Sequence, residues 1–227
     1  MAAHIKALDK DFDLSNAQLS KDYYYASLPL CVIDAVFSIG VRYESVQRTV
    51  RSWCEFQNPV WEMYGRPGKL PPHGLDEFVE LLKRHDVPYL AEHVFQNRQR
   101  TSTRSGILKA EAVYRFARAL LDTGINTLGD TEDTTRNEEA RKKVKTIPGQ
   151  RSGISFNYFL MLAGSDDFVK ADRMLCRFVS AALHRPVEPP EAQALVTQAA
   201  HHLKQVFPRL TPRLLDYVIW GYQRRLK

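Results

Sequence analysis

Hydrophobic residues recur every three or four positions along most of the chain, which is the spacing of helices with one apolar face. The pattern is clearest in five segments, where we expect amphipathic helices: residues 45–56, 75–84, 172–183, 190–207 and 211–225. Two other segments, residues 28–39 and 154–163, are apolar almost all round, which is typical of helices buried among others. No segment alternates convincingly between hydrophobic and polar residues with the period of a strand. The pattern therefore predicts an all-α fold of about ten helices.

Local signals predict two further helices, which are included in that number, and one buried charge. A stripe of apolar residues over 107–121 predicts a helix that is capped by Ser105. The basic segment 138–146 predicts a short helix, ended by the Pro-Gly pair that follows Ile147. Asp34 is the one charge inside the apolar segment 28–39, so we expect it to pair with another group or to face a cleft.

The chain is basic, and its charges are segregated along the sequence. Its 32 Lys and Arg residues against 26 Asp and Glu give a net charge of +6, and its pI is about 9.2. An acidic stretch over residues 130–139 separates two basic clusters, which are Arg98, Arg100, Arg104 and Lys109, and then Arg141, Lys142, Lys143, Lys145 and Arg151. This distribution fits a protein with one face turned toward DNA. Solvated helix faces produce similar runs, so charge alone leaves both interpretations open.

Missing motifs argue against several classes of protein. There is no apolar run of about 18 residues and no signal peptide, so we expect an intracellular, cytoplasmic protein without a membrane span. If the protein comes from a prokaryote, we expect the protein to associate with the nucleoid. Cys31, Cys54 and Cys176 are far apart and form no C-x-x-C pair, which argues against a disulfide framework and a metal site. No P-loop or dinucleotide motif is present, and we expect no cofactor.

The most specific pattern lies in residues 141–179. It combines a basic helix, a tight Pro-Gly turn, an apolar helix, a short loop and Asp172 at the start of the next helix. A turn between helices presents backbone N–H groups and a helix N-terminus, which bind phosphate without reading the base sequence. The residues that we expect to contact DNA are Pro148, Gly149, Gln150, Arg151, Ser152, Gly153, Lys143, Lys145 and Arg104. The alternatives are an ordinary helix-turn-helix corner for the Pro-Gly turn and a simple N-cap for Asp172.

In the order and spacing of these motifs, the sequence resembles the helix-hairpin-helix DNA glycosylase superfamily, in particular its endonuclease III-like branch. The family's L-P-G-x-G hairpin corresponds to residues 147–151, and its V-D-x-H segment corresponds to residues 171–174. Residues 107–110 resemble the end of its G-x-x-x-x-K-A helix entry, and residues 28–46 resemble the buried helix that opens its six-helix lobe. The resemblance covers residues 28–225, roughly.

The resemblance implies a two-lobed helical bundle that contains a helix-hairpin-helix motif. We expect one unit of two lobes. Its parts are a six-helix-type lobe at about 28–140, a hairpin and aspartate segment at 141–180, and a terminal helical lobe formed by 1–27 and 181–227.

The resemblance also implies an activity, base excision from double-stranded DNA by a monomeric DNA glycosylase. Asp172 matches the family's essential aspartate, which stabilises positive charge on the sugar after a nucleotide has been extruded from the duplex. Members that also cleave the strand carry a lysine at the position of Gly153, so we expect hydrolysis of the N-glycosidic bond and no lyase step. The family's four-cysteine motif is absent, so we expect no iron–sulfur cluster.

Other departures from the family pattern leave alternatives open. Arg151 replaces the second glycine of the hairpin, Met174 replaces a histidine, and Gly40 stands where a glutamine often enters the gap in the duplex. One alternative is therefore a DNA-binding protein that has lost catalysis. A second is a helical module whose basic patches bind an acidic protein. The target base is not assigned.

Overall fold

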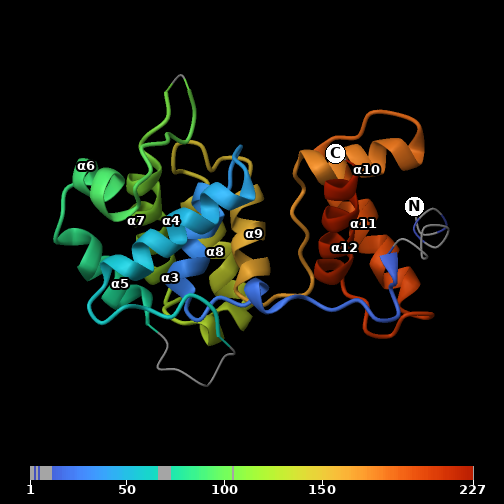
Figure 1. Cartoon of the computed structure of the whole chain (residues 1–227), viewed down its shortest axis with the longest axis horizontal. Helices are drawn as coiled ribbons and strands as arrows, with labels where there is room; N and C mark the ends of the chain where they lie inside the picture. Colours follow the sequence, from blue (N-terminus) through green and yellow to red (C-terminus); the bar gives the residue numbers. More distant parts are fainter. Residues whose placement is uncertain (1–2, 4, 6–11, 66–72, 104, 227) are drawn as a thin grey trace. The chain divides into compact units, whose positions relative to one another are not determined.

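The computed structural model describes residues 3, 5, 12–65, 73–103 and 105–226 (Figure 1). Over these residues the chain forms ten α-helices and no β-strand, so the predicted all-α fold is confirmed. No helix in this part of the chain is both long enough and apolar enough to cross a membrane.

The chain forms two compact units. The larger unit is Lys21–Gly164, and the smaller unit combines Met1–Ser20 with Ser165–Lys227. The boundary after Gly164 falls within residues 141–180, the hairpin and aspartate segment predicted from the sequence. The Pro-Gly turn therefore belongs to the larger unit, and Asp172 belongs to the smaller unit.

The larger unit is built around helix α3 (Leu28–Phe37), all ten residues of which are buried. Helices α4 (Tyr43–Phe56), α7 (Lys109–Leu121) and α9 (Ile154–Leu162) pack against α3, and α5 (Leu75–Lys83) packs against α7 (Figure 1). This arrangement explains why segment 28–37 is apolar almost all round, since other helices cover several of its faces.

Asp34 is the charge buried inside α3, and it is paired as the sequence predicts. It is 1% exposed, and the Tyr25 hydroxyl donates a hydrogen bond of 2.7 Å to its Oδ2 atom. Tyr158, on α9, is also hydrogen-bonded to Asp34. Burial, together with the charge of Asp34, raises the pKa of both tyrosines well above the usual value. The carboxylate therefore ties the segment before α3 and helix α9 to the centre of the unit.

Shorter elements complete the larger unit: η1 (Lys21–Tyr23), α6 (Val87–Tyr89), the π-helical turn η2 (Leu90–Val94), η3 (Leu128–Glu132) and α8 (Thr134–Val144). Helix α8 begins four residues before the expected position of Glu138. Its N-cap is Asp133, whose side chain accepts hydrogen bonds from the backbone N–H groups of Thr135 and Arg136. Part of the acidic stretch is therefore a helix cap.

The start of α7 differs from the sequence prediction. The helix begins at Lys109, and its N-cap is Leu108 rather than Ser105. Lys109 is 2% exposed, and its Nζ donates to the carbonyl oxygens of Phe37 and Ile39 at 2.9 Å each. Its ammonium group satisfies carbonyls at the C-terminal end of α3. The expectation that Lys109 belongs to a basic surface cluster is therefore wrong.

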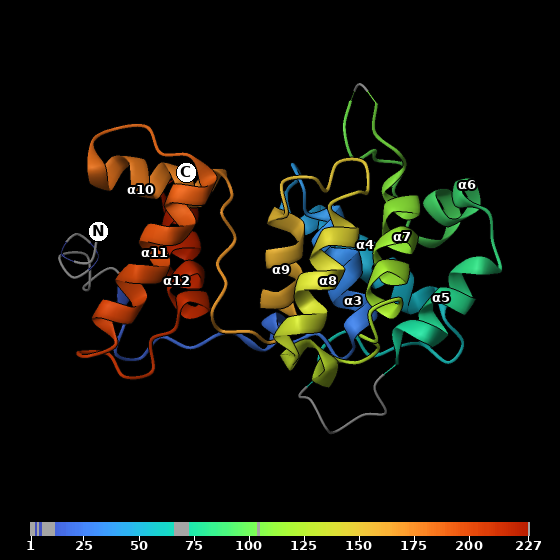
Figure 2. The same ribbon diagram turned by 180° about the vertical axis from the view of Figure 1, so that it is seen from behind.

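The smaller unit consists of α10 (Arg173–Leu183), α11 (Pro189–Leu203) and α12 (Pro212–Arg225), which pack against one another (Figure 2). The N-terminal segment contributes to the same core. The Phe12 ring lies 5.9 Å from Phe178 of α10 and 5.1 Å, edge-on, from Tyr222 of α12. The two ends of the described chain therefore share one hydrophobic core.

Candidate functional site

The turn between α8 and α9, residues 147–153, is a compact hairpin with a fixed backbone. The N–H of Gln150 donates to the carbonyl of Ile147 at 2.9 Å, and the N–H of Gly153 donates to that of Gln150 at 3.1 Å. Gly149 and Gly153 have φ angles of +84° and +76°, in the left-handed region that glycine tolerates best. Gly153 is also the N-cap residue of α9.

Arg141 holds the two helices of the hairpin together. Its guanidinium carbon lies 4.8 Å from the centre of the Phe156 ring, and its Nη1 donates to the side-chain oxygen of Asn157. Its Nε also contacts Glu138 at 3.2 Å. The side chain is 21% exposed, so Arg141 acts as a structural link between α8 and α9.

The predicted phosphate-binding residues differ in exposure. Lys145, Arg151 and Ser152 are exposed, as is Gly149. Gln150 is fully buried, backbone included, so it offers no surface to a ligand in this structure.

The predicted residues Lys143 and Lys145 lie near other residues of the larger unit, whereas the structure does not describe Arg104. Lys143 is half exposed and lies 4.0 Å from the carboxylate of Asp122. The Lys145 Cδ atom would lie 3.8 Å from a Cβ atom built on Gly153. Pro148 is half-buried, and Arg104 lies outside the described residues.

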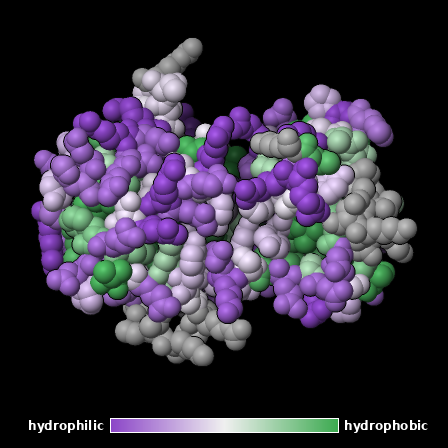
Figure 3. Space-filling view, viewed as in Figure 1, coloured by the Kyte–Doolittle hydropathy of each residue, from purple (hydrophilic) through white to green (hydrophobic). Residues whose placement is uncertain are grey.

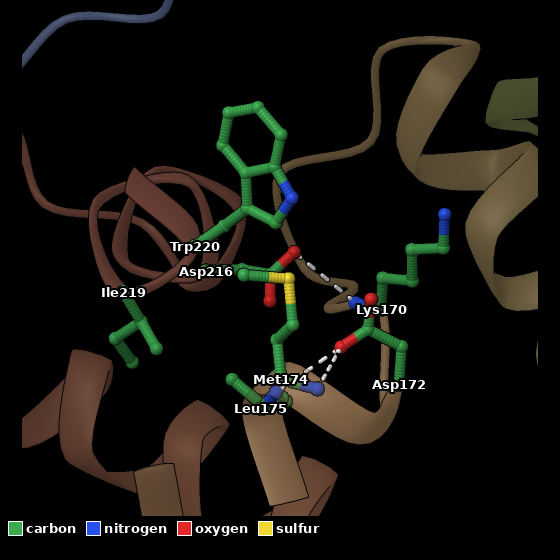
Figure 4. A pocket seen from close by; sticks show the side chains of 7 residues that line it. All are labelled: Lys170, Asp172, Met174, Leu175, Asp216, Ile219 and Trp220. Atoms are coloured by element: carbon green, nitrogen blue, oxygen red, sulfur yellow. Dashed lines mark hydrogen bonds between the residues drawn. The ribbon is translucent and has the colours of Figure 1, made fainter. Parts of the chain in front are cut away.

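Asp172 is the N-cap residue of α10 and lies beside a small cavity (Figure 4). Its Oδ1 atom accepts hydrogen bonds from the backbone N–H groups of Met174 at 2.8 Å and Leu175 at 3.1 Å. The capping role that we weighed as an alternative is therefore present. The cavity has a volume of about 20 Å³ and is lined by Lys170, Asp172, Met174, Leu175, Asp216, Ile219 and Trp220.

A second carboxylate, Asp216 of α12, lines the same cavity. It is 8% exposed, and its Oδ2 atom accepts a hydrogen bond of 3.3 Å from the backbone N–H of Lys170. The pKa of Asp216 is raised to about 7, first by burial and then by the negative charge of Asp172, while the N–H and the charge of Lys170 oppose the shift. Near neutral pH the cavity therefore holds a carboxyl group that gains and loses its proton.

This pair of carboxyl groups has a simple chemical capacity. One group can carry negative charge while the other holds or accepts a proton, which is the division of roles found in many acid–base sites. A volume of about 20 Å³ also exceeds the roughly 10–15 Å³ needed to hold one water molecule.

The sequence did not single out Asp216. A lone aspartate within an amphipathic helix is usually solvated, and only its four-residue spacing from Trp220 places both residues on one face of α12. The structure brings Asp172 and Asp216 together in the smaller unit, and it groups the hairpin residues in the larger unit.

Comparison with known proteins supports the fold and identifies the family. No curated protein matches the sequence. A solved structure, described as MBOgg1 in complex with a low-affinity DNA ligand, superimposes with a TM-score of 0.57 at 17% identity, over 88% of this chain and 60% of the other. The chain thus spans less than two thirds of that protein, and the likeness is one of fold. The sequence also matches, over residues 3–224, the family described as a domain of unknown function (DUF8548), and the chain belongs to this family.

Proposed function

We propose that the protein is a DNA-binding protein of the helix-hairpin-helix glycosylase type, which removes a damaged base by hydrolysis of its N-glycosidic bond. The observation that carries the proposal is the cavity in which Asp172 faces a second carboxyl group, Asp216, with a pKa near neutral. The sequence resemblance assigns the essential carboxylate to the same Asp172. The likeness in fold to a protein solved with a DNA ligand supports the DNA partner.

The proposed reaction breaks the bond between C1′ of the sugar and the nitrogen of the base. The base leaves with the electron pair of that bond, and positive charge develops on the sugar. The Asp172 carboxylate would stabilise this charge electrostatically. A water molecule then adds to C1′ and passes its proton to an ionised carboxylate of the pair, for which a pKa near the working pH is favourable, and the departed base takes up a proton from the solvent.

The hairpin would supply affinity for the DNA backbone. Lys145 and Arg151 are exposed beside it, and charges of this kind bind phosphates independently of base sequence. The position of Gly153 carries no amine, so the proposed chemistry uses water alone and ends at an abasic site.

A second candidate function is DNA binding without catalysis. It is favoured by the two backbone hydrogen bonds to Asp172, which give this residue a purely structural reason to be there. The small volume of the cavity, about 20 Å³, also favours it, since a nucleobase is far larger.

An assay for abasic sites separates the two candidates. Duplexes that carry a broad panel of damaged bases are incubated with the full chain, and abasic sites are revealed by strand cleavage in alkali. We expect product from at least one lesion, and a loss of about 100-fold or more in Asp172→Asn. Asparagine also caps helices well, so the variant should keep its fold.

The controls are an exposed acidic residue of the same unit and a binding measurement. Asp167→Asn should leave the activity unchanged, because Asp167 is exposed and does not line the cavity. DNA binding should survive in Asp172→Asn. If the wild type binds duplex but forms no product on the whole panel, catalysis is excluded and the second candidate stands. If the wild type does not bind even at low salt, both fail, and a pull-down resistant to nuclease would point to the protein-interaction module.

A further inference from the structure

A loop that joins η2 to α7 projects from the larger unit next to the 147–153 hairpin (Figures 1 and 2). We call it the 98–108 loop. Its two arms are joined by backbone hydrogen bonds, from Thr101 N–H to Ile107 O at 2.9 Å and from Lys109 N–H to Gln99 O at 2.8 Å. The Nε of Arg100 also donates to the carbonyl of Gly106 at 2.8 Å. These hydrogen bonds hold the two arms of the loop together, so the loop has a defined conformation where it leaves the larger unit.

The loop and the hairpin are in direct contact through Gly149 and Thr101. A Cβ atom built on Gly149 would lie 2.5 Å from the Cβ atom of Thr101 and 3.0 Å from its carbonyl oxygen. Only a residue without a side chain fits this approach. The contact fixes the position of the loop against the hairpin, and the loop stands out from the surface of the larger unit (Figure 3).

The two segments share a chemical character. Residues 98–108 include three arginines and no acidic residue, and residues 145–153 include Lys145 and Arg151 and no acidic residue. Arg98 and Arg100 are exposed, and Arg98 forms an exposed ion pair with Glu92 at 3.4 Å. Such surface pairs contribute little energy, so Arg98 can exchange this partner for a phosphate at small cost.

The composition also selects between forms of nucleic acid. Neither segment contains Phe, Tyr, Trp or His, whereas surfaces that bind single strands stack bases on aromatic side chains. Arginines, hydroxyl groups and backbone N–H groups are the donors that contact the phosphates and sugars of a duplex. The exposed Ser102, Thr103 and Ser105 add such hydroxyl groups to the loop.

We infer that the 98–108 loop and the 147–153 hairpin form one two-part surface that binds the phosphates of double-stranded DNA. The inference rests on the proposed DNA-binding function and extends it from the hairpin to Arg98 and Arg100. The Gly149–Thr101 contact sets the spacing between the two parts, so that both engage the backbone together.

The test measures duplex affinity as a function of salt. Fluorescence anisotropy of a labelled undamaged duplex compares the full-length wild type with Arg98→Gln/Arg100→Gln and with Lys145→Gln/Arg151→Gln. The matched control is Lys83→Gln/Arg84→Gln at the end of α5, which removes two exposed charges, one of them paired to Glu80 as Arg98 is paired to Glu92. Arg98→Gln alone is included, because Arg100 also holds the loop closed.

Each lost phosphate contact lowers the salt slope by about 0.9, so we expect each double variant at the surface to lower it by about 1.8. At about 0.1 M salt this corresponds to a loss of affinity of up to roughly 60-fold. Arg98→Gln alone should lower the slope by about 0.9, and the control should leave it unchanged.

The possible results separate this inference from the proposed function. If the hairpin variant loses affinity and both loop variants bind as the wild type does, the inference is overturned and the proposed function survives. If the wild type does not bind duplex, both fail. An equal loss in the control would show a general effect of charge and overturn the inference. A loss on single-stranded oligonucleotide as large as on duplex would overturn the assignment to duplex DNA.

Discussion

Replacing Asp216 by asparagine removes a buried carboxyl group and nearly keeps its shape. In the folded chain the pKa of Asp216 is raised to about 7, whereas an aspartate in an unfolded chain has a pKa of about 3.9. Between these two pKa values the unfolded chain has lost the proton and the folded chain still holds it. The unfolded state therefore binds fewer protons, and this group makes the wild type less stable as the pH rises through the interval.

The size of the effect follows from the shift. At about 1.4 kcal/mol for each pKa unit, a shift of about three units corresponds to about 4 kcal/mol. This contribution is complete below about pH 4, declines up to about pH 7 and stays lost above it. The asparagine side chain has no proton to lose in this range. We therefore expect Asp216→Asn to match the wild type near pH 4 and to be more stable than it by up to about 4 kcal/mol at pH 8.

The assay follows the smaller unit alone. Incorporation of 5-fluorotryptophan gives Trp220 its own ¹⁹F resonance, since Trp53 and Trp61 belong to the larger unit. Unfolding of the smaller unit in urea is followed through that resonance from pH 4 to pH 8. The proteins compared are the wild type, Asp216→Asn and, as an exposed control, Asp167→Asn. A difference between wild type and Asp216→Asn that stays constant over this range would refute the reasoning.

A direct titration supports the same test. The ¹³C resonance of the Asp216 carboxyl, assigned by its loss in Asp216→Asn, should titrate with a midpoint near pH 7 in the wild type. In Asp172→Asn the midpoint should fall, because the charge of Asp172 contributes to the shift. A midpoint that Asp172→Asn leaves unchanged would mean that the two groups do not interact.

Three further predictions follow from the larger unit. Gly149→Ala should lower the free energy of unfolding in urea by more than the ~1–3 kcal/mol expected for a strained φ alone, because the new Cβ atom would clash with Thr101. The control is Gly40→Ala, since Gly40 has a φ of +73° and a Cβ atom built on it meets nothing within 4 Å. Equal losses of stability in the two variants would contradict the Gly149–Thr101 contact. Lys109→Met should cost about 3 kcal/mol in the same measurement, because two carbonyls at the end of α3 lose their donor; a loss below about 1 kcal/mol would show that they find other partners. Borohydride should trap no covalent complex between the wild type and an abasic duplex, and a band that Lys145→Gln abolishes would instead assign an amine beside Gly153.

Most of the fold follows from hydrophobic spacing, because burial of one helix face is a local requirement that the sequence must meet. The predicted segments 28–39, 154–163 and 211–225 differ from α3, α9 and α12 by no more than two residues at either end. Helix starts are harder to predict. Asp133 and Ser105 are both good capping residues, and only the packing of the loops decides that Asp133 caps a helix while Ser105 does not.

Of the two carboxyl groups in the candidate site, only one could be predicted from the sequence. Asp172 could be found because it opens a helix at a fixed distance from the hairpin. Asp216 could not, since its significance comes from packing of α12 against the start of α10, more than 40 residues away. For Lys109 the sequence suggests a surface role and the structure shows a buried one. A lysine in a basic stretch gives no sign that its ammonium group donates a hydrogen bond to a carbonyl at the end of a distant helix.

The division of the chain into a continuous larger unit and a smaller unit drawn from both ends has a consequence for synthesis on the ribosome. The larger unit can fold as soon as Gly164 has emerged, whereas Phe12 must wait for Phe178 and Tyr222 before its core can close. The cavity between Asp172 and Asp216 is therefore completed last, when α12 docks. A nascent chain stalled before α12 would already display the basic hairpin but would lack the paired carboxyl groups.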